Sequence, residues 1–206
     1  MTSTDTVDRT PRRPTDKVEE RRRQLAGAAL QTLASLGYAR TSLRDIAQNS
    51  EFSHGVLHYY FRDKIELITY CVRQYKTQCV ERYDAIAADA TDADDLARDA
   101  GDGLAATLVD DALMHRLWYD LRAQSMFEES FRLDVADIDA SLERMIWRVV
   151  DAYAGLVGRE PHSSPALVYA AFDGLFQQCL LRLLAGDAAA ADDLRAGTRT
   201  LLERLV

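Results

Sequence analysis

Residues 41–64 restrict the fold of this chain more than any other segment, because they contain two short helix signals separated by a break of only three residues. The pattern predicts one helix over 43–50 and a second over 54–61, with residues 51–53 as the turn between them. Two helices joined in this way form a helix-turn-helix, whose second helix can enter the major groove of DNA.

Individual side chains support both helix starts. Ser42 can accept a backbone hydrogen bond as the N-cap of the first helix, and Asp45 can accept one in return, as in a capping box. Phe52 is predicted to fill the space between the two helices, and Ser53 to cap the second. Apolar residues recur at spacings of three and four, which places these side chains on inward faces: Leu43, Ile46, Ala47, Leu57 and Phe61.

This segment resembles the TetR family of bacterial transcriptional regulators. The family signature runs Thr-Thr/Ser, Ile-Ala, Ala-Gly-Val-Ser, x-Gly-Thr-Leu-Tyr-x-Tyr-Phe and x-x-Lys. The positions that match it are Thr41, Ser42, Ile46, Ala47, Ser53, Gly55, Leu57, Tyr60, Phe61 and Lys64. Capping, apolar and aromatic positions all keep their spacing, and by motif the resemblance covers roughly residues 16–75.

Two positions depart from the family signature. Glu51 stands where the family usually has Gly, and a left-handed backbone there costs a non-Gly residue roughly 1 kcal/mol, so the turn is expected to differ slightly. His58 stands where the family usually has Tyr, whose hydroxyl typically reaches a DNA phosphate. An imidazole N–H can donate to a phosphate in the same way.

The resemblance implies a homodimer that binds a pseudo-palindromic operator and a repressor that responds to a small-molecule inducer of unknown identity. It implies that base edges are read by His54, Gly55, Val56 and Tyr59. Arg44 would add a base or phosphate contact. The DNA backbone would be held by Thr41, Ser42, His58, Tyr60 and Lys64.

The distribution of charge agrees with a DNA partner, although the net charge of the chain is −8. Residues 1–64 carry 11 basic and 8 acidic side chains, whereas the rest of the chain carries 14 basic and 25 acidic ones. A basic N-terminal part on an acidic remainder suits a protein that approaches phosphate with one end.

Composition and periodicity predict an all-α chain, since 206 residues contain only 10 Gly and 4 Pro. We expect a disordered basic arm over 1–14, with Arg9, Arg12 and Arg13; a three-helix DNA-binding domain over 15–63; and a helical ligand-binding and dimerisation domain over 64–206. The predicted helices outside the helix-turn-helix span 16–36, 64–87, 92–109, 130–158, 165–186 and 188–205, with a further aromatic-rich helical segment over 112–127.

The helix that begins at Lys64 is the only covalent link between the two parts, so a signal sensed in the second must reach the first through it or through packing against it. In the family the second part encloses the inducer cavity, and the segment 112–127 often lines it. The resemblance thus gives Trp118, Arg122, Met126 and Phe127 as ligand-binding candidates. Each could equally be a core residue.

By the same resemblance the last two helices pair with their copies in a four-helix interface. Candidate interface residues are Ala171, Gly174, Leu175, Gln178, Arg182 and Leu194. Asp173 and Gln177, four apart in an otherwise apolar helix, need polar partners, either within the protein or on a ligand.

No pattern indicates an enzyme, a cofactor or a structural metal. The three cysteines have no metal-type spacing and indicate free thiols in a reducing cytoplasm. Nine aspartates over 84–111 predict a solvated acidic face rather than a metal site, and His54 with His58 lacks a third ligand. No apolar run reaches the roughly 18 residues that a membrane span needs, and the N-terminus does not read as a signal peptide.

Two other functions are compatible with the pattern. The first is a helical sensor that binds a ligand without DNA. The second, within the DNA-binding class, is an activator or a regulator with no small-molecule ligand. A DNA affinity that falls steeply with salt separates the sensor from the regulators.

Overall fold

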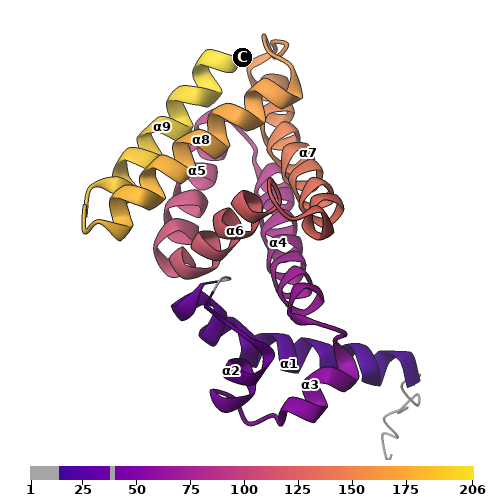
Figure 1. Ribbon diagram of the computed structural model, residues 1–206. Helices are drawn as coiled ribbons and strands as arrows, with labels where there is room; N and C mark the ends of the chain where they lie inside the picture. Colours follow the sequence, from indigo (N-terminus) through magenta and orange to yellow (C-terminus); the bar gives the residue numbers. More distant parts are fainter. Residues whose placement is uncertain (1–13, 38–39) are drawn as a thin grey trace, which may run out of the picture.

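The computed structural model describes residues 14–37 and 40–206, and the elements in that part of the chain are helical (Figure 1). The predicted all-α fold is confirmed. Residues 1–13 of the predicted basic arm, with Arg9, Arg12 and Arg13, lie outside the described residues, and Pro14 begins α1. Two groups of helices follow each other along the chain: α1 to α3, which we call the head, and α4 to α9, which we call the body.

The head contains α1 (Pro14–Leu36), α2 (Leu43–Gln48) and α3 (His54–Tyr60). The predicted caps are present: Ser42 and Asp45 form the capping box of α2, and the Ser53 hydroxyl accepts the backbone N–H of Val56 at the start of α3. Phe52 is buried between the two helices, as expected. These short helices start where the sequence places acceptors for their free N–H groups.

The turn at Glu51 forms without the left-handed backbone expected of a glycine. No described residue other than Gly has a positive φ, so Glu51 carries none of the associated strain. The departure from the family signature is therefore accommodated by an ordinary turn conformation.

Replacing Ser42 by alanine is expected to lower the free energy of unfolding by about 1 kcal/mol, because the first turn of α2 then loses its side-chain acceptor. A urea titration followed by circular dichroism measures the change. Ser42→Asn, which retains an acceptor, should recover most of the loss. Equal stability of Ser42→Ala and the unmodified protein would mean that the cap contributes nothing.

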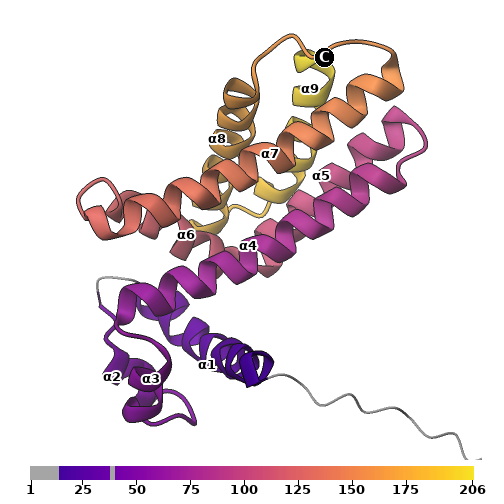
Figure 2. The same ribbon diagram turned by 90° about the vertical axis from the view of Figure 1, so that its right-hand side faces the viewer.

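The body begins with α4 (Lys64–Asp89), which runs from the head along α7 (Arg132–Val157) (Figure 2). At 1.5 Å per residue its 26 residues span about 39 Å. The other elements are α5 (Ala93–Asp110), α6 (Ala112–Gln124), a short 3-10 helix η1 (Glu129–Phe131), α8 (Pro165–Leu184) and α9 (Ala190–Leu205). Helices α8 and α9 lie together at the side of the body, with α5 packed on α9 (Figure 1).

Four apolar residues continue the apolar spacing of their helices and are nevertheless exposed: Val18, Leu36, Leu113 and Leu156. Each lies within five residues of the end of its helix. Periodicity identifies the face of a helix, but a residue at the end is buried only where a neighbouring helix extends that far.

The acidic segment 84–111 begins in the last turns of α4 and continues through α5. Its aspartates are partly or fully solvent-exposed, as expected, and several of them also form ion pairs: the paired Asp84, Asp94 and Asp102 side chains are 40%, 90% and 52% exposed. Asp92 caps α5, and three other aspartates pair with arginines on α7 or α9: Asp84 with Arg148, Asp94 with Arg199, and Asp102 with Arg195. Part of the acidic face therefore joins neighbouring helices.

Helix α8 has an exposed apolar face. By length and composition it is the one described helix that could cross a membrane, yet only 33% of that window is buried within the chain. The exposed small and apolar residues recur along one side: Leu167, Ala170, Gly174, Leu181 and Leu184. A soluble monomer seldom leaves such a stripe uncovered.

Candidate functional site

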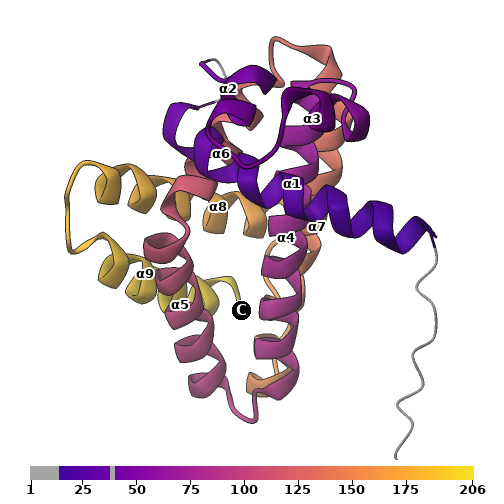
Figure 3. The same cartoon turned by 90° about the horizontal axis from the view of Figure 1, so that it is seen from below.

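The outer face of α3 presents polar and aromatic groups to solvent. His54, Gly55 and His58 are exposed, and Tyr59 is 81% exposed. The rings of His54 and His58 meet edge to face at 4.4 Å. Seen from below, α1, α2 and α3 lie in front of the body (Figure 3), and the body helices α4 and α6 pack against α1. These side chains are free to meet a large partner.

The inner face of α3 holds the helix in place. Leu57 and Phe61 are fully buried, and the guanidinium of Arg22 from α1 lies 4.7 Å from the centre of the Phe61 ring. Arg22 also forms an ion pair with Glu66 at the start of α4. The orientation of α3 is thus fixed jointly by α1 and α4, which makes it sensitive to a movement of either.

The other residues predicted to contact DNA lie on α2 and its cap, on α3 and at the start of α4. Arg44 and Ser42 are exposed, although the Ser42 hydroxyl is engaged by Asp45. Val56, Tyr60 and Lys64 are half-buried. Burial lowers the pKa of Lys64, and the charges of Glu128 and Asp120 act in the opposite direction.

Thr41 does not match its predicted role in holding the DNA backbone. Its side chain is 2% exposed, and its hydroxyl donates to the carbonyl oxygen of Gly37 at 2.8 Å. The hydroxyl therefore satisfies a carbonyl at the end of α1, where helix carbonyls lack helical partners, and a phosphate cannot reach it.

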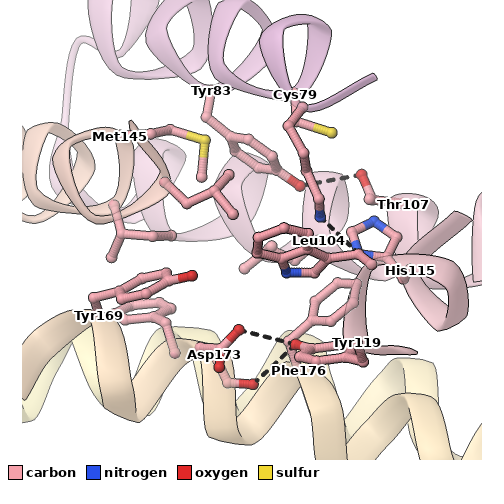
Figure 4. Close-up of a pocket in the computed structure, with 15 residues that line it drawn as sticks. Cys79, Tyr83, Leu104, Thr107, His115, Tyr119, Met145, Tyr169, Asp173 and Phe176 are labelled. Carbon is pink, nitrogen blue, oxygen red and sulfur yellow. Dashed lines mark hydrogen bonds between the residues drawn. The ribbon is translucent and has the colours of Figure 1, made fainter. Parts of the chain in front are cut away.

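A second candidate site is a cavity of about 60 Å³ in the body, lined by residues of α4, α5, α6, α7 and α8; Figure 4 shows its lining side chains. Aromatic and aliphatic side chains form most of its wall: Tyr83, Leu104, Trp118, Tyr119, Leu142, Met145, Ile146, Tyr169, Phe172 and Phe176. The polar lining residues are Lys76, Thr107, His115 and Asp173, and Cys79 completes the lining. An apolar cavity with few polar groups is typical of small-molecule sites.

Lys76 is the most unusual group in this cavity. Its side chain is 6% exposed, and its ammonium lies 3.2 Å from Nδ1 of His115. Burial lowers the pKa of Lys76 to about 8. Burial also holds the pKa of His115 well below its usual value, with the charge of Lys76 acting in the same direction. A neutral His115 can accept from Lys76 at Nδ1 and donate from Nε2 to the Tyr75 hydroxyl, 2.9 Å away.

A network of paired charges closes another part of the cavity wall. Arg122 binds Asp139 at 3.0 Å and Asp173 at 2.6 Å, and the hydroxyls of Tyr169 and Tyr119 donate to the same two carboxylates. Burial opposes the charge of Arg122, but its bond to Asp173 and the nearby carboxylates raise its pKa. Asp173 thus has the protein partners that its place in an apolar helix required. Gln177 is exposed.

Only part of the predicted ligand set lies at the cavity. Trp118 lines it, and Arg122 lies behind the wall in contact with Asp173. Met126 and Phe127 do not line it: α6 ends at Gln124, and the two side chains are 68% and 81% exposed in the following turn. The predicted helical segment over 112–127 is therefore too long, and these two side chains face solvent instead of the cavity.

Lys76 and His115 were not predicted from the sequence. A signal was nevertheless present, because Lys76 lies four residues after Val72 and three before Cys79, on the apolar stripe of α4. His115 lies three residues before Trp118 on the buried side of α6. A charged residue on an inward face is a candidate for function.

The predicted dimer residues are divided between surface and core. Gly174 and Gln178 are exposed on α8, while Ala171 and Leu175 are half-buried. Arg182 binds Asp187 and Asp193 within the chain. Leu194 is 1% exposed, so its side chain packs inside the protomer and cannot lie on an outer surface.

Residues 25–71 match the sequence profile of the bacterial regulatory proteins of the tetR family. Among solved structures, a TetR transcription regulator from Haloarcula marismortui is 16% identical, with 91% of this chain and 98% of that chain covered and a TM-score of 0.74. FadR from Bacillus subtilis in complex with stearoyl-CoA is 18% identical, with coverage of 89% and 97% and a TM-score of 0.71.

A transcriptional regulator from Saccharomonospora viridis in complex with choline is 18% identical, covers 90% of this chain and 96% of that chain, and has a TM-score of 0.69. No curated protein matches the sequence. At these identities the structural matches establish the fold, whereas the sequence match is confined to the helix-turn-helix and its neighbours.

Proposed function

We propose that this chain, a TetR-family regulator by its head domain and its fold, represses transcription as a cytoplasmic homodimer and releases its operator when a small molecule binds in the body. The observation that carries the proposal is the pairing of an exposed polar face on α3 with a buried anchor beneath it. An exposed recognition helix without a fixed orientation could not read a sequence.

In this proposal His54, Gly55, Val56 and Tyr59 meet base edges in the major groove, and Arg44 adds a contact beside them. Backbone contacts come from Ser42, His58, Tyr60 and Lys64. Thr41 contributes by fixing the end of α1 through its bond to Gly37. Phosphate contacts set the register of the protein on DNA, and base contacts set the choice of sequence.

The proposed homodimer uses the exposed apolar face of α8, with Gly174 and Gln178 near its centre. Two copies of this face would bury it in a four-helix arrangement with α9. The dimer would place two copies of α3 about 34–36 Å apart, as successive major grooves on one side of DNA require.

The proposed route from the cavity to the head uses two helices. Helix α4 carries Lys76 and begins directly after the head, and α6 carries His115 and Trp118. On its other side α6 packs against α1, where the Arg116 guanidinium donates to the carbonyl oxygen of Ser35. A ligand that changes the packing of α6 or α4 would therefore shift α3 and the spacing of the dimer.

The two ligand complexes of the same fold, with stearoyl-CoA and with choline, support a ligand site in this architecture. They differ in chemistry and do not name the ligand of this chain.

The proposal is tested by fluorescence anisotropy with DNA that flanks the coding region, at two salt concentrations and against a scrambled duplex. We expect selective binding by an even number of subunits, weakening steeply with salt. If the protein does not bind the flanking DNA selectively, binding sequences are selected from a pool of random duplexes. If this selection enriches no sequence, the head does not recognise a specific DNA sequence, and the alternative of a ligand sensor that does not bind DNA is favoured.

A further inference from the structure

We propose that the body cavity binds a small apolar acid, with the Lys76 ammonium in contact with its carboxylate. The inference deepens the proposed function, since it assigns a chemical class to the ligand of the same cavity. It rests on the hydrogen bonding of two cations, Lys76 in the cavity lining and Arg122 behind the cavity wall.

The hydrogen bonding of Lys76 is incomplete. An ammonium has three N–H donors, and in the described part of the chain the Lys76 nitrogen has one hydrogen-bond partner, Nδ1 of His115. The rings of Tyr75 and Trp118 lie 5.5 and 5.4 Å from it and stabilise the charge without accepting conventional hydrogen bonds. No carboxylate of the described residues forms an ion pair with Lys76. Buried cations are normally paired, so a partner of opposite charge is expected here.

Arg122 shows the opposite arrangement. Its guanidinium binds Asp139 and Asp173. The hydroxyls of Tyr119 and Tyr169 donate further hydrogen bonds to these carboxylates. A ligand anion would therefore have to displace a carboxylate to reach Arg122, whereas Lys76 has donors available. A ligand cation would find Asp173 already engaged on both oxygens. The free hydrogen-bonding capacity of the site favours an anion.

The rest of the cavity requires an apolar ligand body. Aliphatic and aromatic walls surround the polar end, including Leu104, Met145, Ile146 and Phe172. One water needs roughly 10–15 Å³ of cavity volume. The cavity of about 60 Å³ therefore has room for only a few non-hydrogen atoms. A larger acid must separate the helices that meet at the cavity. Because α4 and α6 are among them, entry of the acid acts on the two helices that contact the head.

The charge of Lys76 gives the proposed contact a pH dependence. Lys76 contacts His115 on α6 and the ring of Tyr75 on α4. The other titratable and charged groups that act on it electrostatically are Cys79 on α4, Arg122 on α6, Asp139 on α7 and Asp173 on α8. Lys76 carries its charge below a pKa of about 8 and loses it above, while a free carboxylic acid stays ionised from about pH 6 upward. Attraction for the acid is therefore present near pH 7 and declines as the pH rises through 8.

The experiment compares unbranched acids from butyrate to dodecanoate, and benzoate, with their primary amides. Binding is followed in DNA-free solution by tryptophan fluorescence, to which Trp118 in the cavity contributes. We expect at least one acid to bind at least 10-fold more tightly than its amide at pH 7. The preference should shrink severalfold at pH 9.5.

Two variants locate the contact. Lys76→Met should bring the ratio of acid to amide affinity close to one, whereas Arg73→Met, which removes an exposed cation one turn earlier on α4, should leave the ratio unchanged. If Lys76→Met does not fold, the pH series on the unmodified protein decides. Equal affinity for acids and amides, no binding by any acid, or an acid preference that survives Lys76→Met would overturn the proposal.

The outcome is separable from that of the proposed function. An acid preference in a protein that binds no duplex would keep the anion site and refute the regulator. Selective DNA binding without an acid preference would do the reverse.

Discussion

The double substitution His54→Ala and Tyr59→Ala is expected to lower operator affinity by about 30-fold or more, because lost base contacts cost about 1–3 kcal/mol each. Both side chains are exposed, so the substitution removes atoms from the surface and leaves the buried anchor of α3 intact. Fluorescence anisotropy with the operator measures the loss. The unfolding curve should stay within about 0.5 kcal/mol of the unmodified protein.

The salt dependence distinguishes base reading from phosphate attraction. These two substitutions should leave affinity for a scrambled duplex and the slope of affinity against salt nearly unchanged, since neither removes a proposed phosphate contact. Phe127→Ala is a matched control, because Phe127 and Tyr59 are both 81% exposed and Phe127 belongs to the body. If the control weakens the operator complex as much as the double substitution does, α3 is not the reading element.

The double substitution Leu167→Glu and Leu181→Glu is expected to convert the proposed homodimer to a monomer and to lower operator affinity by about 100-fold or more. The two leucines are 64% and 63% exposed on the same face of α8, so glutamate can be accommodated in a monomer. In the proposed dimer the carboxylates would be buried against apolar residues, which is costly for unpaired charges. Loss of the dimer is expected to weaken operator binding, because linking two heads raises the overall affinity about 10²–10⁴-fold.

Analytical ultracentrifugation measures the mass of the variant over a range of concentrations. The control is Leu133→Glu, which adds one glutamate, half the charge of the double substitution, at an 82% exposed leucine on α7. A dimer that persists with both glutamates in place would show that another surface joins the subunits. A monomeric unmodified protein would contradict the homodimer itself.

Much of the head was predictable because its determinants are local. Ser42 and Ser53 start helices by accepting N–H groups three residues ahead, and Leu57 and Phe61 identify the buried side of α3 by their spacing. These interactions operate within one or two turns of chain, so the sequence contains all their participants. Thr41 was misjudged because its partner, the Gly37 carbonyl, depends on how the end of α1 is placed.

The cavity could not be predicted in the same way. Met126 and Phe127 were chosen for their residue types, whereas the termination of α6 at Gln124 places them in solvent. Leu194 was assigned to the subunit interface, yet it is enclosed within the protomer. Residue type and periodicity do not specify which neighbouring helix covers a given turn.

The sequence by itself determined the all-α class, the helix-turn-helix and the exposed outer face of its second helix, because capping and 3.6-residue periodicity act over a few residues. Only the tertiary structure decided that Lys76 meets His115, 39 residues further along the chain, and that Arg122 is occupied by Asp173, 51 residues away. The physical reason is the range of the interaction. A buried charge acquires its chemistry from partners on other helices, and packing alone brings those partners within hydrogen-bonding distance.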